Sequence, residues 1–320
     1  MRTLVSGPTG FVGTGLIRHL TADPAHHVVA AGRGATISPH ERVHAIQVGD
    51  LGAETDWRAA LAGVGTVIHL AARAHVMRDT ADDPLVAFRQ ANFEGSLRLG
   101  SQAAEAGVRR FVYVSSIKVN GEASTVGLPF RVDDAPQPQD PYGISKLEAE
   151  IGLNRIAAAA GMELVVVRPP LVYGPGVRAN FRSMMGWLRR GIPLPFGAID
   201  NRRSLVALDN LCDLLVTCTH HPGAAGHTFL VSDGEDVSTT QLLRRLGIAL
   251  GHPARLVPLP PAALRAVFGA LGKADIAQRL LSSLQVDISA ARTRLGWQPP
   301  ISLDEGLRRA AAAFLAETAR

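Results

Sequence analysis

The feature that most constrains the fold is a set of three glycines at three-residue spacing near the N-terminus. Gly7, Gly10 and Gly13 follow the apolar pair Leu4–Val5, and apolar residues with helical spacing come after them. Strand, glycine turn and helix, in this order, is the context of a dinucleotide-binding site. The first glycine permits a tight turn, the second lets the backbone approach a pyrophosphate, and the third allows close helix packing. We therefore expect a phosphate-binding turn here, with the diphosphate at the helix N-terminus.

Strand-like and helix-like segments alternate from this turn to about residue 170. Strands are expected at about 28–31, 43–48, 66–70, 111–114 and 164–167, and helices at about 55–61, 83–106 and 142–160. Strict alternation of this kind predicts an α/β fold of Rossmann type, with a doubly wound parallel sheet.

The alternation loosens after Pro169-Pro170, where proline and glycine interrupt a series of helical stretches. We expect a dinucleotide-binding domain at 1–170 and a smaller, mixed C-terminal lobe at 171–320 that binds the substrate. The strand-like run 228–231 suggests that parts of 200–235 return to the main sheet.

Composition narrows the classes of function. The net charge of +5 comes from arginines that are spread along all 320 residues, without the basic stripe expected of a nucleic-acid binder. No apolar run approaches the roughly 20 residues of a membrane span, and no signal-peptide pattern opens the chain. Cys212 and Cys218 have no metal-ligand partners at suitable spacing, so we expect two buried thiols and no metal site. These features predict a cytoplasmic protein.

Four side chains in two stretches could take part in acid–base chemistry. Tyr142 and Lys146 are four residues apart at the start of a predicted helix, so they share one face. A lysine ammonium near a phenol lowers the pKa of the phenol from about 10 and makes it a better acid–base group. Ser115 and Ser116 follow the strand at 111–114, at the sheet edge where open α/β folds bind ligands.

With these features together, the chain resembles the extended short-chain dehydrogenase/reductase family, in its branch of nucleotide-sugar epimerases and reductases. The resemblance covers nearly the whole chain. The matching residues are the three glycines, Asp50-Leu51, Leu70-Ala71-Ala72, Asn92, Ser115-Ser116, Tyr142-x-x-x-Lys146, Arg168-Pro169, Tyr173-Gly174-Pro175-Gly176 and Leu295-Gly296-Trp297.

The resemblance implies roles for these residues. Tyr142 is the acid–base, Lys146 lowers its pKa and holds the nicotinamide ribose, and Ser116 orients the sugar oxygen. Asp50 and Leu51 would contact adenine. The other cofactor-binding residues that it implies are Gly7, Gly10, Phe11, Val12, Gly13, Leu70, Ala71, Ala72, Asn92 and Pro169.

The resemblance also implies a UDP-sugar substrate, bound mainly by the second lobe. Asn180 and Arg203 match positions that contact the diphosphate, and Arg279 is a weaker candidate for a second such contact. Pro195 and Phe196 belong to a loop that lies against the uracil. Arginine suits this task because it can bind phosphate with two hydrogen bonds.

The reaction is less constrained than the family. Related 4,6-dehydratases carry an acid pair where this chain has Ile117 and Lys118, so dehydration is not expected. Most epimerases have tyrosine where this chain has Asn120. These departures, with the lack of a carboxylate after the second strand, favour a reductase of the C4 ketone of a UDP-4-keto-6-deoxy-2-acetamido sugar. A UDP-hexose or UDP-N-acetylhexosamine 4-epimerase with retained NAD is the alternative, and a non-catalytic NAD(P) sensor is a reading of another class.

Arg33 bears on the choice of cofactor. NAD sites place an acidic residue at the end of the second strand, whereas this chain has Gly32-Arg33 there. An arginine attracts a 2′-phosphate, so NADP(H) is favoured and NAD(H) remains possible.

Two helices carry more apolar residues than packing on one sheet requires. They span about 83–106 and 140–160, and the residues concerned are Leu97, Leu99, Leu147, Ile151 and Ile156. In the resembling family these helices form a four-helix bundle between two subunits, so we expect a homodimer.

Overall fold

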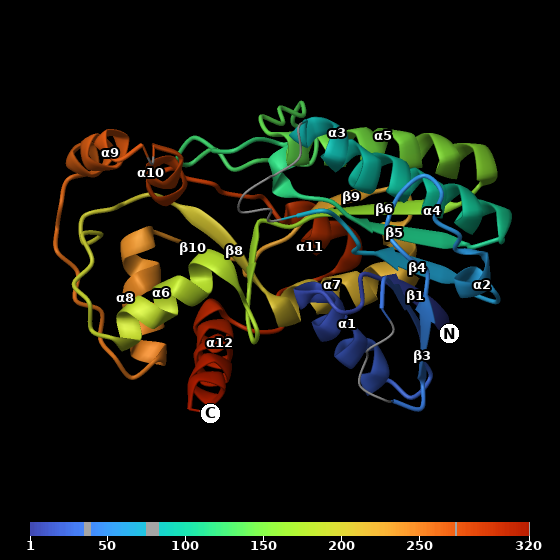
Figure 1. Cartoon of the computed structure of the whole chain (residues 1–320), viewed down its shortest axis with the longest axis horizontal. Coiled ribbons are helices and arrows are strands. Elements are labelled where there is room, and N and C mark those ends of the chain that lie inside the picture. Colours follow the sequence, from blue (N-terminus) through green and yellow to red (C-terminus); the bar gives the residue numbers. More distant parts are fainter. Residues whose placement is uncertain (35–39, 75–82, 273, 320) are drawn as a thin grey trace.

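A parallel sheet of seven strands organises the larger part of the molecule (Figure 1). The computed structural model describes residues 1–34, 40–74, 83–272 and 274–319. The strand order is β3-β2-β1-β4-β5-β6-β9, and every neighbouring pair is parallel. The strands are β1 (Arg2–Ser6), β2 (His27–Gly32), β3 (Val43–Gln47), β4 (Thr66–His69), β5 (Arg110–Val114), β6 (Glu163–Arg168) and β9 (Thr228–Leu230). The order reverses between β1 and β4, which confirms the predicted doubly wound fold.

Helices cover both faces of this sheet because both faces of its strands are apolar. Val5 and Val112 face the core shared with α1 (Phe11–Ala22) and α7 (Leu208–His220). Leu4 and Phe111, one residue away on the same strands, face the core shared with α4 (Gly95–Glu105) and α5 (Pro141–Ala160). This alternation of neighbours is the period-two geometry of a strand buried on both sides.

The expected helix at 83–106 is three consecutive segments. It begins as α3 (Pro84–Phe88), widens into the π-helix η1 (Arg89–Glu94) and continues as α4. Such π turns are often found at functional sites. The helix expected at 55–61 is shorter, since only α2 (Arg58–Leu61) is helical and the Trp57 amide instead donates to Oε1 of Gln102 at 2.7 Å.

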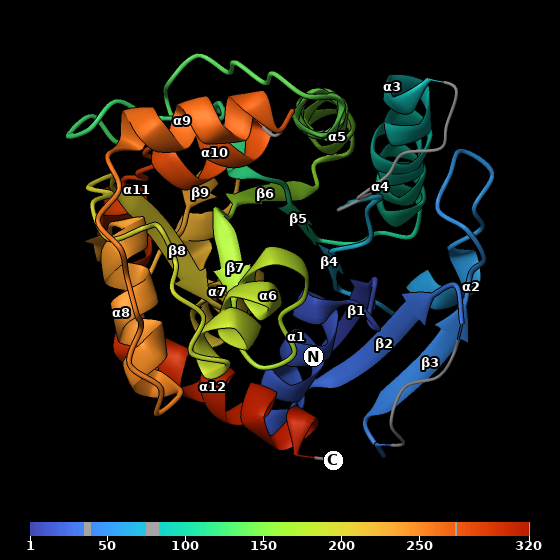
Figure 2. The ribbon, with the colours of Figure 1, turned by 60° about the vertical axis from the view of Figure 1, so that its left-hand side comes forward.

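The second lobe contains a mixed sheet of three strands in the order β10-β8-β7. Figure 2 shows β7 and β8 of this sheet near the middle of the view. β7 (Leu171–Tyr173) runs parallel to β8 (Arg203–Ala207), and β10 (Asp236–Val237) runs antiparallel to it. The remaining elements are α6 (Ala179–Arg189), the 3-10 turn η3 (Pro222–Ala224), α8 (Thr239–Ala249), α9 (Pro261–Ala270), α10 (Ala274–Leu281), α11 (Ser289–Leu295) and α12 (Leu303–Thr318).

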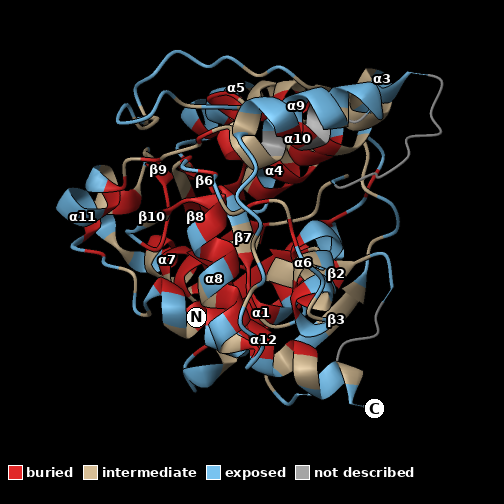
Figure 3. Ribbon diagram, turned by 90° about the vertical axis from the view of Figure 1, so that its left-hand side faces the viewer, coloured by how far each residue is buried: buried red, intermediate tan, exposed pale blue. Residues whose placement is uncertain are grey.

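The two parts meet through a buried polar network and one aromatic side chain. The phenol of Tyr173 donates to Asp233 at 2.7 Å, and Asp233 also accepts from the Ala207 amide and from Asn210 at 2.7 Å. Phe11, at the start of α1, packs against the cores of both parts. Buried residues concentrate on the strands and on inner faces of helices such as α7, while α9 is largely exposed (Figure 3).

Both cysteines of α7, Cys212 and Cys218, are buried and unpaired, as predicted, and burial raises the pKa of each thiol above its usual value.

Within the described parts of the chain, none of the helices has the length and apolar character needed to cross a membrane.

Candidate active site

The glycine turn has the crowded geometry that its spacing predicts. Gly7 has φ of +68°, and a Cβ there would lie 2.9 Å from the Ala71 amide nitrogen. At Gly13, a Cβ would come within 2.2 Å of the Gly7 carbonyl oxygen. A side chain is therefore excluded at Gly7 and at Gly13, which keeps the turn and the start of α1 close together.

The first turn of α1 is open to an anion. Gly10 is its N-cap, no side chain caps it, and its first turn contains no acidic residue. The side chains of Phe11 and Val12 pack inward against the core, so only their backbone faces this end. A helix N-terminus of this kind attracts phosphate through its N–H groups and dipole.

The other residues predicted to bind the cofactor follow strands whose carboxyl ends share one sheet edge. Leu70, Ala71 and Ala72 follow β4, and the amides of Leu70 and Ala71 donate to the Ser6 hydroxyl at the end of β1. Pro169 follows β6 and is buried, and its carbonyl accepts from the Ile117 amide at 3.0 Å.

Arg33 and Asp50 meet at this edge, beyond β2 and β3. The guanidinium of Arg33 lies 3.8 Å from the Asp50 carboxylate, and both side chains are more than four-fifths exposed. The Asp50 carboxylate thus lies beside the end of β2, although Asp50 itself follows β3. Leu51, next to it, packs closely on Gly95 at the start of α4.

Asn92 is fully buried in the π-helix η1 and forms hydrogen bonds with the backbone of the segment after β4. Its Oδ1 accepts from the Arg73 amide at 2.7 Å, while its Nδ2 donates to the Arg73 carbonyl and to Ser145, each at 3.1 Å. Ser145 in turn donates to the Tyr142 carbonyl. Because its amide is engaged in these bonds, Asn92 shapes the site through the backbone.

Tyr142 occupies the first turn of α5, partly buried beside Ser116. Burial is the main cause that raises the pKa of Tyr142 to about 12, and the charge of Asp140 adds to it. A hydrogen bond with the Ser116 hydroxyl acts in the opposite direction and lowers that pKa. Phe88 of α3 contacts the phenol ring edge to face, with 6.0 Å between ring centres.

Lys146 is almost completely buried, one helical turn after Tyr142 on α5. Its ammonium donates to the Val114 carbonyl at 2.8 Å and lies 4.5 Å from the centre of the Tyr113 ring. Burial lowers the pKa of Lys146 to about 7. Burial and Asp140 are the causes that raise the pKa of Tyr142, and the effect predicted for Lys146 on that pKa stays a prediction.

The two serines after β5 have different surroundings. Ser116 is the N-cap of the 3-10 turn η2 (Ile117–Val119), and its hydroxyl accepts from the Lys118 amide at 3.3 Å. The Ser115 hydroxyl is buried, and no described residue forms a hydrogen bond with it. Ser116 is therefore the serine that reaches Tyr142, as the family pattern implies.

Asn120 is buried in the interior. Its Oδ1 accepts from Arg168 at 3.0 Å, and its Nδ2 donates to the Arg131 carbonyl at 3.0 Å. Since both polar atoms of the amide are engaged, this residue is part of the core. Its difference from tyrosine therefore says little about the reaction.

The residues predicted to bind the substrate are spread over the second lobe. Asn180 is exposed at the start of α6, and Pro195 is partly buried in the loop before β8. Phe196 packs into the core of this lobe, so its side chain does not present a face to solvent. Arg203 begins β8 and donates to the Ser282 carbonyl at 3.3 Å, and burial lowers its pKa. Arg279 lies on α10, and its side chain is outside the described part of the structure.

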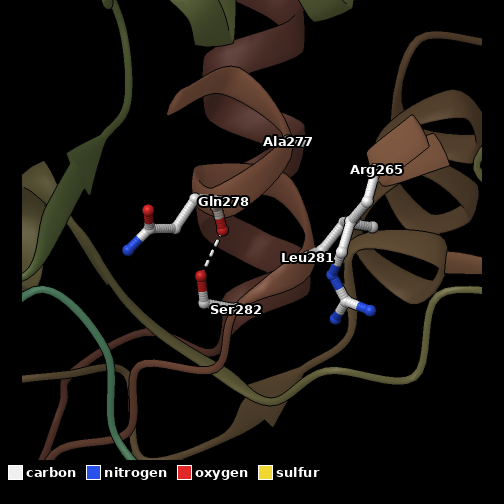
Figure 4. A pocket seen from close by; sticks show the side chains of 5 residues that line it. All are labelled: Arg265, Ala277, Gln278, Leu281 and Ser282. Atoms are coloured by element: carbon white, nitrogen blue, oxygen red, sulfur yellow. Dashed lines mark hydrogen bonds between the residues drawn. The ribbon is translucent and has the colours of Figure 1, made fainter. Parts of the chain in front are cut away.

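An open cavity of about 390 Å³ lies between α9 and α10 (Figure 4). Its lining residues come from α9 and α10 and from the segment just after α10, and they are Arg265, Ala277, Gln278, Leu281 and Ser282. Ser282, whose hydroxyl is bonded to the Gln278 carbonyl, also accepts from Arg203. The cavity and the predicted diphosphate contact thus share one residue.

Sequence reasoning missed three contacts around Tyr142. Phe88 was not singled out, and neither was Asp140, whose carboxylate caps α5 by accepting from the Gly143 amide at 2.7 Å. Lys118 was considered only because related dehydratases have an acidic residue at its position. The Asp140-Pro141 pair before Tyr142 is a helix-start signal that could have revealed the cap. Phe88 and Lys118 had no such signal.

Comparison with known proteins agrees with this geometry. Residues 3–232 match the NAD dependent epimerase/dehydratase family. The chain is 49% identical to a UDP-glucose 4-epimerase of Vibrio cholerae over 314 residues, which covers 98% of this chain and 95% of that protein.

Solved structures show the same fold over the full length. The UDP-glucose 4-epimerase of Thermotoga maritima, solved with UDP-glucose, matches with a TM-score of 0.78 at 22% identity, covering 100% of both chains. The UDP-glucuronic acid 4-epimerase of Bacillus cereus, solved with NAD, matches with a TM-score of 0.78 at 22% identity, covering 99% of both chains. With its glycine turn, its Ser116–Tyr142 pair and this full-length match, the chain belongs to the NAD-dependent epimerase/dehydratase family of extended short-chain dehydrogenases/reductases.

Proposed function

We propose that the chain is a UDP-hexose 4-epimerase that keeps its NAD between turnovers. The observation that carries this proposal is the 49% identity, over almost the whole of both chains, to a UDP-glucose 4-epimerase. The placement of Tyr142 beside Ser116 supplies the acid–base pair that the reaction needs. The 4-ketoreductase, our leading expectation from the sequence, is not confirmed, and the epimerase alternative fits better.

Three sequence features favoured reduction: asparagine at position 120, the missing carboxylate after the second strand, and the missing acids at 117 and 118. None of the three distinguishes a reductase from an epimerase. Asn120 is held by Arg168 in the core, so its identity does not report on the reaction. Asp50 brings a carboxylate to the edge where one seemed to be missing. The lack of acids at 117 and 118 argues against a dehydratase only, since epimerases and reductases both work without them.

The residues at the glycine turn fit a dinucleotide. The turn excludes side chains at Gly7 and Gly13, and the uncapped first turn of α1 offers N–H groups to a diphosphate. Leu70–Ala72, Asp50 and Leu51 would border the adenosine half, and Lys146 and Pro169 the nicotinamide half. NAD, which the Bacillus cereus relative binds, is the cofactor that we propose in place of NADP.

When bound, NAD would accept a hydride from the sugar and later return it. The chain itself moves the proton: Tyr142 takes it from the C4 hydroxyl of the sugar and gives it back to the same oxygen. The Ser116 hydroxyl lowers the pKa of Tyr142 and can donate to the substrate oxygen.

Epimerisation also requires the 4-keto sugar to turn between the two proton transfers. The site must therefore hold the UDP end firmly and the hexose loosely. We propose that the second lobe supplies this anchor, with Asn180 and Arg203 at the diphosphate and the loop at Pro195 at the uracil. Arg279 on α10 is a further candidate for the diphosphate.

The decisive assay supplies UDP-glucose, or UDP-N-acetylglucosamine, without added cofactor and follows the formation of the C4 epimer. In parallel, a UDP-4-keto-6-deoxy sugar is supplied with NADPH, and oxidation of the NADPH is followed. Epimer formation without cofactor consumption supports the proposal. NADPH-dependent reduction without epimer formation would show that the ketoreductase reading was right.

Tyr142→Phe is the matched variant for this assay. We expect turnover to fall by about two to four orders of magnitude, the usual scale for an acid–base residue. The nucleotide released from the denatured variant and its circular dichroism should equal those of the wild type. Turnover close to that of the wild type would contradict the role of Tyr142.

A further inference from the structure

Lys118 connects the turn after β5 to the helix that carries Tyr142. Its ammonium donates to Oε1 of Glu122 at 2.9 Å and to Oδ2 of Asp140. The Lys118 side chain is 31% exposed, which shields these bonds in part from water. Burial acts against the ammonium, but the bonds to Asp140 and Glu122 outweigh it and raise the pKa of Lys118. The lysine is therefore charged at neutral pH.

Asp140 uses its two carboxylate oxygens for two tasks. Oδ2 accepts from Lys118, and Oδ1 accepts from the Gly143 amide as the N-cap of α5. Gly143 itself lies so close to the turn that a Cβ there would be 2.9 Å from the Lys118 carbonyl oxygen. Tyr142, between Asp140 and Gly143, is thus set on a helix turn that rests directly on Lys118.

The Asp140 carboxylate is also the charge that most disfavours ionisation of Tyr142. After burial, it is the next cause that raises the pKa of this phenol. A cation on the same carboxylate offsets part of that repulsion. Two titratable groups interact with Tyr142 directly: Asp140, the N-cap of α5, and Tyr113 of β5. Lys146 and Glu150 follow one and two turns later on α5, and Lys118 pairs with Glu122 beside the cap. The Arg73 guanidinium stands over the ring of Phe88, which contacts the Tyr142 ring.

We propose that Lys118 is a positioning residue for Tyr142, which holds the Asp140 cap in place and reduces the repulsion between that carboxylate and the Tyr142 phenolate. The inference rests on the proposed function, in which Tyr142 exchanges the proton of the sugar. Where the related dehydratases carry an acid, this chain carries a cation that acts through the helix cap.

The first test is the pH dependence of kcat/KM for epimerisation. Lys118→Met should move the apparent pKa of the group that must be deprotonated upward by about half a unit, less than the roughly one to three units of a charge in direct contact. Lys118→Arg, which keeps the cation, should restore most of the wild-type profile.

Asp140→Asn separates electrostatics from folding, because asparagine is as good an N-cap as aspartate. This variant should move the apparent pKa downward. In its background Lys118→Met should cause no further shift, since the carboxylate that the lysine offsets is gone. A Lys118→Met profile at the wild-type position, or a shift that persists in the Asp140→Asn background, would overturn the proposal.

The second test does not depend on turnover. The chain has three tyrosines, so tyrosinate absorbance can be titrated with NAD present and sugar absent, with Tyr142→Phe identifying the Tyr142 step. Lys118→Met should move this step upward, over the pH range where circular dichroism shows a folded protein. If no sugar nucleotide is epimerised, the proposed function fails, but this titration still decides the role of Lys118.

Arg245→Met is the matched control. Its guanidinium is also 31% exposed and also binds a carboxylate, that of Glu235, with bonds of 2.9 and 2.6 Å in the second lobe. Both titrations should be unchanged by this variant. An equal shift in Arg245→Met would mean that loss of any partly buried ion pair has the effect, and would count against Lys118.

Discussion

Arg168 binds both carboxylate oxygens of Glu150, at 3.0 and 2.6 Å, inside the protein core. Its third contact is the Asn120 amide oxygen, so β6, α5 and the turn after β5 are joined at one point. Lys146 lies one helical turn before Glu150, and the carboxylate acts to raise the pKa of that lysine. The pair thus anchors the helix that carries both Tyr142 and Lys146.

Removal of one partner of this pair should be costly. Glu150→Leu leaves the Arg168 guanidinium buried without a counter-charge, so we expect a loss of about 3 to 5 kcal/mol in the free energy of unfolding. Replacement of both residues by apolar ones of similar size should recover much of it. Urea unfolding of Glu150→Leu, of an apolar variant of Arg168 and of the double variant measures these free energies. Equal stability of all three would contradict a stabilising role of the Arg168–Glu150 pair.

Gly13→Ala should damage the cofactor site. The added Cβ would lie 2.2 Å from the Gly7 carbonyl oxygen, so the turn must move, at a cost of about 1 to 3 kcal/mol for overpacking. The variant should retain less nucleotide after purification. Gly52→Ala is the control, because no atom of the described residues lies within 4 Å of a Cβ at that position. Full nucleotide retention in Gly13→Ala would show that the turn tolerates a side chain.

Lys146 should make stability depend on pH in alkaline solution. Its pKa is about 7 in the folded chain, against roughly 10.4 for an unfolded lysine. Between these values the unfolded state binds the extra proton, so the stability of the wild type should rise with pH. In Lys146→Met this rise should be absent. Thermal unfolding of both proteins across this range checks the difference, and parallel curves would contradict a depressed pKa.

The Arg33–Asp50 contact should influence the choice of cofactor. Asp50→Asn removes a negative charge beside Arg33, the residue predicted to attract a 2′-phosphate, so binding of NADPH should improve by about two- to fivefold, the scale of an exposed ion pair. Arg33→Ala should weaken NADPH selectively. Fluorescence titration with NADH and NADPH gives both constants, and equal changes for the two cofactors would argue against this placement.

The homodimer through α3, α4 and α5 remains a prediction. In the structure, fewer apolar residues of these helices are exposed than the sequence analysis assumed. Leu99 is fully buried against the sheet, and Leu97 and Ile156 are partly buried against the same core. These side chains therefore pack within the protomer and do not support a subunit interface. Ile151 at 46% exposure and Val86 at 57% are the exposed apolar residues there.

Ile151→Glu should therefore convert a dimer into a monomer, because a charge would be buried at the interface. Ile248→Glu on α8, which replaces a side chain that is 73% exposed, should leave the dimer intact. Light scattering distinguishes these outcomes. A wild-type monomer at micromolar concentration would rule the dimer out.

Local features of the fold were predictable from the sequence because they depend on neighbouring residues. The turn at Gly7 requires a positive φ, and the strands alternate or run apolar according to the faces they bury. The Tyr142–Lys146 spacing likewise places both residues on one helix face. Even the length of the helix at 83–106 was close, although its π segment was not foreseen, since no local pattern marked it.

Contacts between distant segments were decided only by the tertiary structure. Lys146 turns to the Val114 carbonyl rather than to the phenol four residues away, because burial leaves its ammonium that acceptor on β5. Asn120 is engaged by Arg168, 48 positions later, and Lys118 by Asp140, 22 positions later. The sequence determined which groups could take part in the chemistry, because residue type and spacing are local properties. Their partners and charge states followed from burial and from through-space contacts, which no local pattern contains.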